Sequence, residues 1–127
     1  MKTILLLSAL LIPTLASASD NLPPVREGQL QDGRTALTDV VGRTLYVFDE
    51  DTGPESTCYD ACARAWPPAL VGADTLLPEL VTTTVRRDGT LQLSFEGRPL
   101  YYFVGDQAVG ESNGDGLAGT WHVIVRQ

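Results

Sequence analysis

The sequence predicts a mainly β domain of the α+β class, built from two tandem, pseudo-symmetric β-rich copies with one short helix near residues 58–66. Three observations carry this prediction. A strand-like aromatic motif occurs twice, Asp-Gly and similar dipeptides mark tight turns, and one short stretch spaces its apolar residues as a helix does. The length of 127 residues is that of a single domain.

The internal repeat holds without gaps. Residues 42–48, Gly-Arg-Thr-Leu-Tyr-Val-Phe, return 55 positions later as Gly-Arg-Pro-Leu-Tyr-Tyr-Phe at 97–103. Nine of the 25 positions from 42 to 66 are identical in the second copy, whereas average composition gives about one or two by chance. The recurring motif residues are Tyr46 and Tyr101, Phe48 and Phe103, Asp51 and Asp106, and Trp66 and Trp121. Duplication of one supersecondary unit explains the pattern.

Each copy is predicted to contain a strand buried on both faces. Tyr46 and Phe48 alternate with Leu45 and Val47, so both faces of this segment are apolar, and the second copy repeats the alternation. Strands of this kind lie centrally and are covered on both sides. We therefore expect Trp66 and Trp121, like these aromatic residues, to be core residues.

Turn dipeptides predict the neighbouring strands. In the second copy, Asp88-Gly89 separates residues 82–87 from 90–95, and Glu96-Gly97 leads into 98–104, which predicts a three-stranded meander. Asp32-Gly33 and Val41-Gly42 indicate the same arrangement in the first copy, and residues 121–126 read as a closing strand.

The short helix carries both cysteines. Thr57 is the expected N-cap, with Asp60 completing a capping box, and Pro67-Pro68 ends the helix. One apolar stripe runs along it, formed by Cys58, Ala61, Cys62, Ala65 and Trp66. The equivalent segment of the second copy, residues 110–120, holds four glycines and is expected to be a loop.

The first 18 residues have the features of a secretory signal peptide. Lys2 is the positive residue, residues 4–12 are apolar, and Ala16-Ser17-Ala18 forms a small-residue cleavage site. We expect an extended lead-in at 19–29, then one domain at 30–127 with copies at about 30–80 and 81–127. The expected protein is soluble, without a membrane span or lipid anchor, in the periplasm or secreted.

Charge excludes some classes of partner. The chain has 9 Lys and Arg against 16 Asp and Glu, a formal charge of −7, and loss of Lys2 with the leader would make it −8. Nucleic-acid binders depend on Lys and Arg at phosphates, and anionic membranes also attract basic segments. The acidic balance favours cationic partners over either.

The two cysteines allow three interpretations. An exported Cys58-x-x-x-Cys62 pair predicts a disulfide, provided that the first helical turn is distorted or Cys58 lies just before it. Alternatively, the two thiolates and His122 bind copper or zinc. A redox-active dithiol is the third interpretation, although the Cys-x-x-Cys spacing of thiol oxidoreductases is absent.

Other polar groups give weaker signals. Residues 111–116 space oxygen ligands like part of a calcium loop, but a glycine-rich turn is the preferred interpretation. Asp51 and Asp106 are expected to cap their own turns, the alternative being a carboxylate pair. A Ser–His–Asp hydrolase would have to use His122, and no nucleophile-elbow motif is present.

An aromatic binding groove is the remaining alternative. Tyrosine and tryptophan rings can line a site for a sugar, a peptide or a haem edge. Tyr59 and Tyr102 are the rings expected to be most exposed.

The motif residues resemble the bacterial family known as the secreted repeat of unknown function. Its Tyr-x-aromatic-x-x-Asp hallmark occurs here twice, at 46–51 and 101–106, and residues 56–63, 66–68 and 110–116 are also similar. The resemblance implies a small exported module and implies no reaction. Many members are predicted lipoproteins, but the lipobox cysteine is absent from this sequence.

We therefore expect an exported, non-enzymatic envelope module that binds an unknown ligand or envelope protein, without a cofactor. The alternative from a different functional class is a periplasmic copper- or zinc-handling or thiol-redox accessory protein that uses Cys58 and Cys62.

Overall fold

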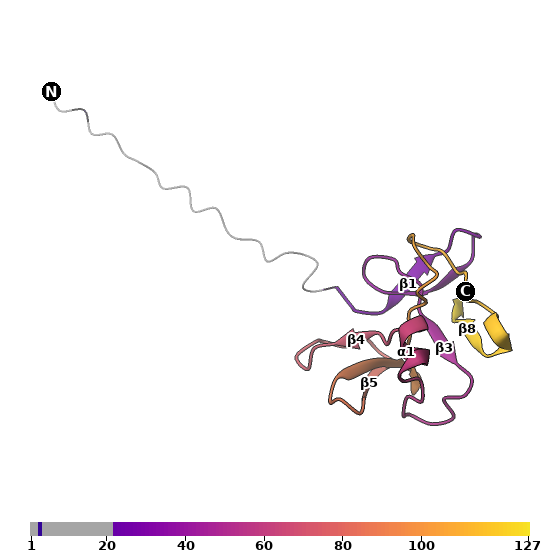
Figure 1. Ribbon diagram of the computed structural model, residues 1–127. Helices are drawn as coiled ribbons and strands as arrows, with labels where there is room; N and C mark the ends of the chain where they lie inside the picture. Colours follow the sequence, from indigo (N-terminus) through magenta and orange to yellow (C-terminus); the bar gives the residue numbers. More distant parts are fainter. Residues whose placement is uncertain (1–2, 4–21) are drawn as a thin grey trace.

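A computed structural model describes Thr3 and residues 22–127 (Figure 1). Its strands are β1 Arg26–Gln29, β2 Thr35–Thr38, β3 Tyr46–Phe48, β4 Leu70–Val71, β5 Val81–Val85, β6 Leu91–Phe95, β7 Arg98–Pro99, β8 Trp121–Val123 and β9 Val125–Arg126. The helical elements of this part are α1 Ala61–Ala65 and the 3-10 turn η2 Leu117–Gly119. The predicted mainly β, α+β class is confirmed. The signal peptide predicted at 1–18 lies, apart from Thr3, outside the described residues.

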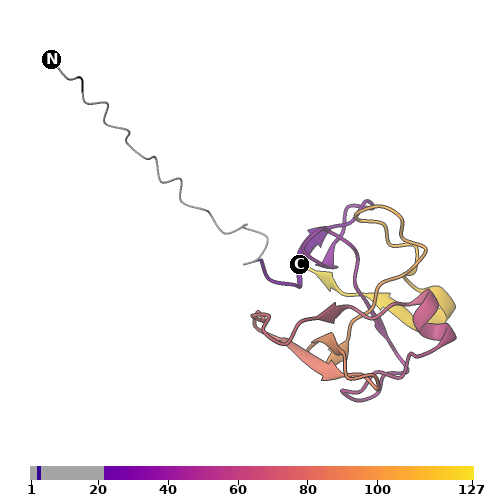
Figure 2. The same cartoon turned by 60° about the vertical axis from the view of Figure 1, so that its left-hand side comes forward.

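The two copies exchange strands. One sheet has the order β1-β2-β9, so the hairpin of the first copy receives the last strand of the second. Another has the order β4-β6-β5, with β7 also on β6, so the hairpin of the second copy receives β4 from the first. The pair β3–β8 lies between them and joins the copies again. In Figure 2 the yellow C-terminal strand lies beside the indigo strands of the first copy.

Both Asp-Gly dipeptides form the predicted hairpin turns. Gly89 has φ +85°, and its N–H donates to the carbonyl of Arg86 at 2.9 Å. Gly33 has φ +95° and occupies the same place in the first hairpin. Glycine adopts this left-handed conformation without the steric cost that a Cβ would bring. Strands β5 and β6 pair from Val81↔Phe95 to Val85↔Leu91.

Three predicted boundaries are wrong. The closing strand predicted at 121–126 divides into β8, which pairs with β3, and β9, which pairs with β2. The strand predicted at 98–104 shortens to β7. The Leu100 N–H still donates to the Leu93 carbonyl of β6 at 2.8 Å, but Tyr101 bridges Tyr46 and Pro68 instead. At the other end, β1 falls inside the predicted lead-in of 19–29, and Val25 is a buried core residue. Strand β1 is mostly exposed and polar, so its sequence lacks the apolar alternation that reveals a strand.

The core lies on both faces of β3, as predicted. One cluster includes Leu45, Val47 and Leu100, and the other includes Tyr46 and the aromatic motif residues. All three residues of β3 are buried. Because successive side chains of a strand point to opposite faces, one three-residue strand contributes to both clusters.

The helix is shorter than predicted, and its predicted cap is wrong. Asp60 is the N-cap residue, with φ +54° and no side-chain cap bond. Thr57 instead donates from its N–H and its Oγ1 to Asp51 Oδ1, at 2.8 and 2.6 Å. The chain at Thr57 and Cys58 is thereby held on a non-helical path. The end before Pro67 agrees with the prediction, since the Trp66 N–H makes the last bond, to the Cys62 carbonyl at 2.8 Å.

The glycine-rich segment is a series of turns with η2 near its end, close to the loop that was predicted. At Gly114, close packing explains why the residue is a glycine. A Cβ on Gly114 would lie 2.5 Å from the Trp66 ring, so a larger residue would displace the indole.

Four aromatic rings form a stack that joins the copies. Trp66 and Trp121 are parallel with centroids 3.8 Å apart. Phe48 lies on the outer face of Trp121 at 4.1 Å, and Phe103 lies on the outer face of Trp66 at 4.4 Å. Each tryptophan therefore contacts the phenylalanine of the opposite copy. Both tryptophans are about 95% buried, which confirms their predicted place in the core.

Replacement of either tryptophan by alanine should cost about 3–5 kcal/mol of unfolding free energy. Because the two rings contact each other, the double variant should cost less than the sum, by roughly 0.5–1.5 kcal/mol. Urea melts of the single and double variants measure both quantities. Leu76→Ala, at an 87% exposed side chain, is the control and should change stability by less than about 0.5 kcal/mol. Additive losses would contradict the stack.

Candidate functional site

The two motif tyrosines meet at the centre of the molecule. The Tyr46 N–H donates to the Tyr101 carbonyl at 2.8 Å, and the Tyr101 N–H donates to the Tyr46 carbonyl at 2.9 Å. The two backbone hydrogen bonds are therefore reciprocal. Both are fully buried. This antiparallel bridge marks the pseudo-two-fold relation between the copies.

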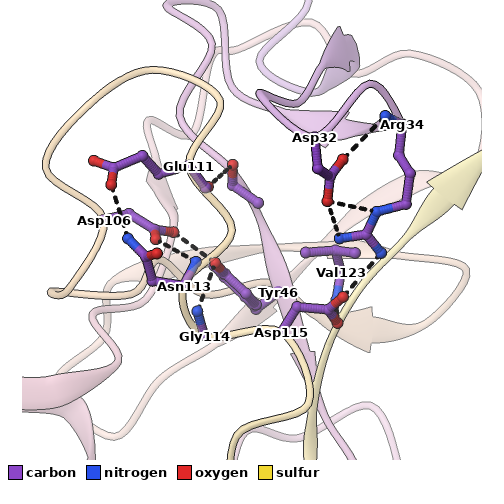
Figure 3. Close-up of polar contacts among 10 residues, drawn as sticks. Asp32, Arg34, Tyr46, Asp106, Glu111, Asn113, Gly114, Asp115 and Val123 are labelled. Carbon is purple, nitrogen blue, oxygen red and sulfur yellow. Dashed lines mark hydrogen bonds and ion pairs between the residues drawn. The ribbon is translucent and has the colours of Figure 1, made fainter.

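The motif aspartates complete this exchange. The Tyr46 hydroxyl donates to Asp106 Oδ2 at 2.6 Å, and the Tyr101 hydroxyl donates to Asp51 Oδ2 at 2.7 Å. Figure 3 shows the first of these bonds, with Asn113 and Gly114 beside it. Each tyrosine therefore binds the aspartate of the opposite copy.

The aspartates also hold their own loops, as predicted. Oδ1 of Asp51 accepts from Thr57, and Oδ1 of Asp106 accepts from the Asn113 N–H at 2.9 Å (Figure 3). One carboxylate oxygen thus caps a turn while the other crosses to the second copy. The sequence predicted the local role and missed the crossed one.

Beyond Tyr101 the symmetry is broken by a buried arginine. Arg86 donates from Nη1 to Ser56 Oγ at 3.0 Å and to Gln92 Oε1 at 2.7 Å, and from Nη2 to the Cys58 carbonyl at 3.0 Å. Ser56 also bonds the Tyr101 hydroxyl. A chain of hydrogen bonds therefore connects the guanidinium to the Asp51 carboxylate. This connection stabilises two buried charges without placing them in direct contact.

The first copy has an apolar version of the same position. Leu30 precedes its Asp-Gly turn as Arg86 does, and each N–H bonds the residue four positions on, at 2.8 and 2.9 Å. Leu30 and Ala36 are buried where the second copy buries Arg86 and Gln92. Arg86 is not among the residues predicted from the sequence. Aligning the two Asp-Gly turns would have revealed it, because Arg86 then occupies the position that Leu30 has in the first copy.

The predicted disulfide between Cys58 and Cys62 is present, with Cα atoms 5.3 Å apart. Cys58 lies before α1 and is fully buried, while Cys62 lies in the first turn and is half-buried. This is the arrangement expected if Cys58 stands outside a regular helix. The bond ties the Asp51-held loop to the helix.

The third residue of the predicted metal set lies elsewhere. His122 is in β8, paired with Val47 of β3. Its Nε2 is 2.7 Å from Asp49 Oδ2, whose other oxygen is 3.3 Å from Arg98 Nη2. All three side chains are exposed. Within residues 22–127 and Thr3, no three His, Cys, Asp or Glu side chains are grouped as metal ligands.

The polar residues of the glycine-rich segment bind the protein itself (Figure 3). Glu111 Oε1 accepts from the N–H groups of Gln107 and Ala108, and its Oε2 accepts from Asn113 Nδ2 at 2.9 Å. These bonds, first among them that from Asn113, hold the pKa of the Glu111 carboxyl below its usual value. Asp115 accepts from the Val123 N–H and pairs with Arg34 at 2.9 Å. These contacts fit the glycine-rich turn that the sequence favours over a calcium loop.

A cavity of about 270 Å³ lies where the two copies meet. It is lined by Val41, Arg43, Thr44, Tyr102, Phe103, Asp106, Gln107, Ala108 and Val109. Residues 41–44 come from the first copy and residues 102–109 from the second. The lining therefore combines apolar side chains with one cation and one carboxylate.

One wall of this cavity is fixed by Tyr102. The Tyr102 hydroxyl donates to Asp39 Oδ2 at 2.9 Å, and the Arg43 guanidinium lies 3.9 Å above the ring centroid. Asp39 Oδ1 also accepts the Arg43 N–H at 2.9 Å. Tyr102 is half-buried rather than exposed, and Tyr59 is half-buried beneath Arg86 and Arg87. Both rings are among the residues predicted from the sequence, whereas Arg43 and Asp39 are not.

The fold and this centre define a mainly β module made of two interlocked copies. A family model described as a secreted repeat of unknown function matches residues 31–70 and 82–125. These matches cover more than half of the chain, which belongs to this family. No curated protein and no solved structure matches significantly. Among the described residues, no helix is both long and apolar enough to cross a membrane.

The buried tyrosines predict loss of stability at high pH. Burial is the largest cause that raises the pKa of Tyr46, Tyr101 and Tyr102 above the ordinary value of 10.0, and the neighbouring aspartates add to it. Below pH 10 both folded and unfolded chains keep these phenols protonated. Above it the unfolded chain ionises first, so the free energy of unfolding should fall as pH rises further.

Tyrosinate absorbance and urea melts between about pH 8 and pH 12 test this expectation. These three phenols should ionise only as the protein unfolds. Normal titration of these three tyrosines in a folded protein, with unchanged stability, would contradict the buried Tyr–Asp bonds.

Proposed function

We propose that the protein is an exported, non-enzymatic binding module that acts in the periplasm or as a secreted protein, without a cofactor or a lipid anchor. The cavity between the copies is its binding site. The observation that supports this proposal is the position of the cavity at the junction of the two copies, where Asp106, the partner of the Tyr46 hydroxyl, is one of its lining residues. Membership of a secreted family supports the export.

The lining suggests the chemistry of the ligand. Val41 and Val109 are about 60% exposed at the cavity and can cover an apolar group. Arg43 and Asp106 offer a charge of each sign. A volume of about 270 Å³ suits a side chain or a small ring, since sites for drug-sized ligands run from about 300 to 1,000 Å³. The acidic surface favours a ligand that carries a positive charge.

The alternative role in copper, zinc or thiol chemistry has less support. It needs free sulfurs, whereas Cys58 and Cys62 are bonded to each other. The side chain of His122 pairs with Asp49 instead. We therefore propose a structural role for the disulfide, which fixes the loop beneath Arg86 and Ser56.

NMR titration of the ¹⁵N-labelled protein tests the binding site. The probes are short peptides that contain one arginine and one aromatic residue, with neutral monosaccharides for comparison. A probe that binds should shift the amides of residues 41–44 and 102–109 at concentrations up to about 1 mM.

Two matched variants separate cavity binding from other effects. Ala108→Trp should fill the cavity and abolish the shifts, whereas Ala73→Trp, at another exposed alanine outside this cavity, should leave them unchanged. Shifts that survive in Ala108→Trp, or the absence of shifts with every probe, would contradict the proposal.

A further inference from the structure

The outer edge of β5 is a self-complementary surface. We propose that two copies of this chain pair through it as antiparallel strands about a two-fold axis at Thr83. The two β4-β6-β5 sheets then form one continuous sheet across the dimer. The proposal concerns a surface separate from the cavity, so it stands or fails independently of the proposed function.

The edge is open along its middle. Within the described part of the chain, β5 pairs with β6 alone. Thr82 and Thr83 are exposed, and Val85 is 66% exposed. Such an edge presents unpaired backbone groups to other strands.

The alternation of hydrogen bonds along β5 fits the proposed axis. The Arg86 N–H donates inward, across the hairpin, to the Thr90 carbonyl at 2.9 Å. Alternate residues of an antiparallel strand face the same neighbour, so Thr84 and Thr82 also face β6. Thr83 and Val85 therefore turn their N–H and carbonyl groups outward. The Val81 N–H already donates to Pro78 at 3.2 Å, which leaves its carbonyl for the Val85 N–H of the second copy.

The sequence of β5 reads the same in both directions about this axis. Residues 81–85 are Val-Thr-Thr-Thr-Val. With Thr83 facing itself, Val81 faces Val85 of the second copy and Thr82 faces its Thr84. β-branched pairs of this kind favour strand pairing.

The pairing is limited to the strand itself. Leu80 has φ +70°, and the turn closed by the Val81 N–H and the Pro78 carbonyl ends the extended segment, so residues 81–85 of each copy form the contact.

The equivalent edge of the first copy differs. Strand β1, Arg-Glu-Gly-Gln, carries two charges and a glycine where β5 has Val-Thr-Thr-Thr-Val. Charged side chains and glycine discourage pairing between edges. The two edges therefore have equivalent places in the fold but differ in charge and in strand propensity. Strand β5 is the edge suited to pairing with a second copy.

Sedimentation velocity over a range of protein concentrations tests the dimer. A contact of about five residues per strand is small, so we expect a weak, concentration-dependent dimer. Thr83→Pro removes an outward N–H and should weaken the dimer by about tenfold or more. Glu27→Pro, at the equivalent place on β1, is the matched control and should not change it. Thermal melts verify that both variants are folded.

A monomeric wild-type protein at every concentration, or equal effects of Thr83→Pro and Glu27→Pro, would overturn the proposal.

Discussion

The reciprocal bridge between Tyr46 and Tyr101 is the constraint on which the rest of the structure depends. It fixes the two copies in antiparallel contact, and each hydroxyl then reaches the aspartate of the opposite copy, at 2.6 and 2.7 Å. These bonds leave neither tyrosine hydroxyl without a partner in the core, where an unpaired polar group costs about 1–3 kcal/mol. The stack of Trp66 on Trp121 repeats the same exchange with apolar groups. Stability is therefore shared between the copies.

Much of the fold could be predicted from local patterns. The Asp-Gly turns, the apolar alternation around Tyr46 and the core position of Trp66 each depend on neighbouring residues in the sequence, and all three are confirmed. Strand exchange could not be predicted, because β4 and β9 contain two residues each, too few to show the alternation that reveals a strand. The predicted capping box is absent because Asp51, six residues earlier, accepts the Thr57 N–H that Asp60 would have accepted. The Thr57 hydroxyl also donates to Asp51.

The site was less predictable than the fold. The sequence identified the motif residues and the disulfide, since these types and spacings are distinctive. It missed Arg86, which is buried against Ser56 and Cys58 of the first copy, and Arg43, which lies exposed over the Tyr102 ring of the second. The buried Arg86 of the second copy occupies the position that Leu30 has in the first. The two copies therefore share this hairpin backbone but differ in the side chains that they bury there. Functional differences between the halves are to be sought at such positions.

The most direct test of this account is to divide the chain between the copies. We would prepare residues 19–80 and 81–127 separately and record ¹⁵N NMR spectra of each fragment alone and of the mixture. Because each copy lacks a strand, a tyrosine partner and half of the aromatic stack, neither fragment should show dispersed amide signals, and the mixture should regain the spectrum of the whole protein. A folded fragment on its own would contradict the claim that the copies complete each other.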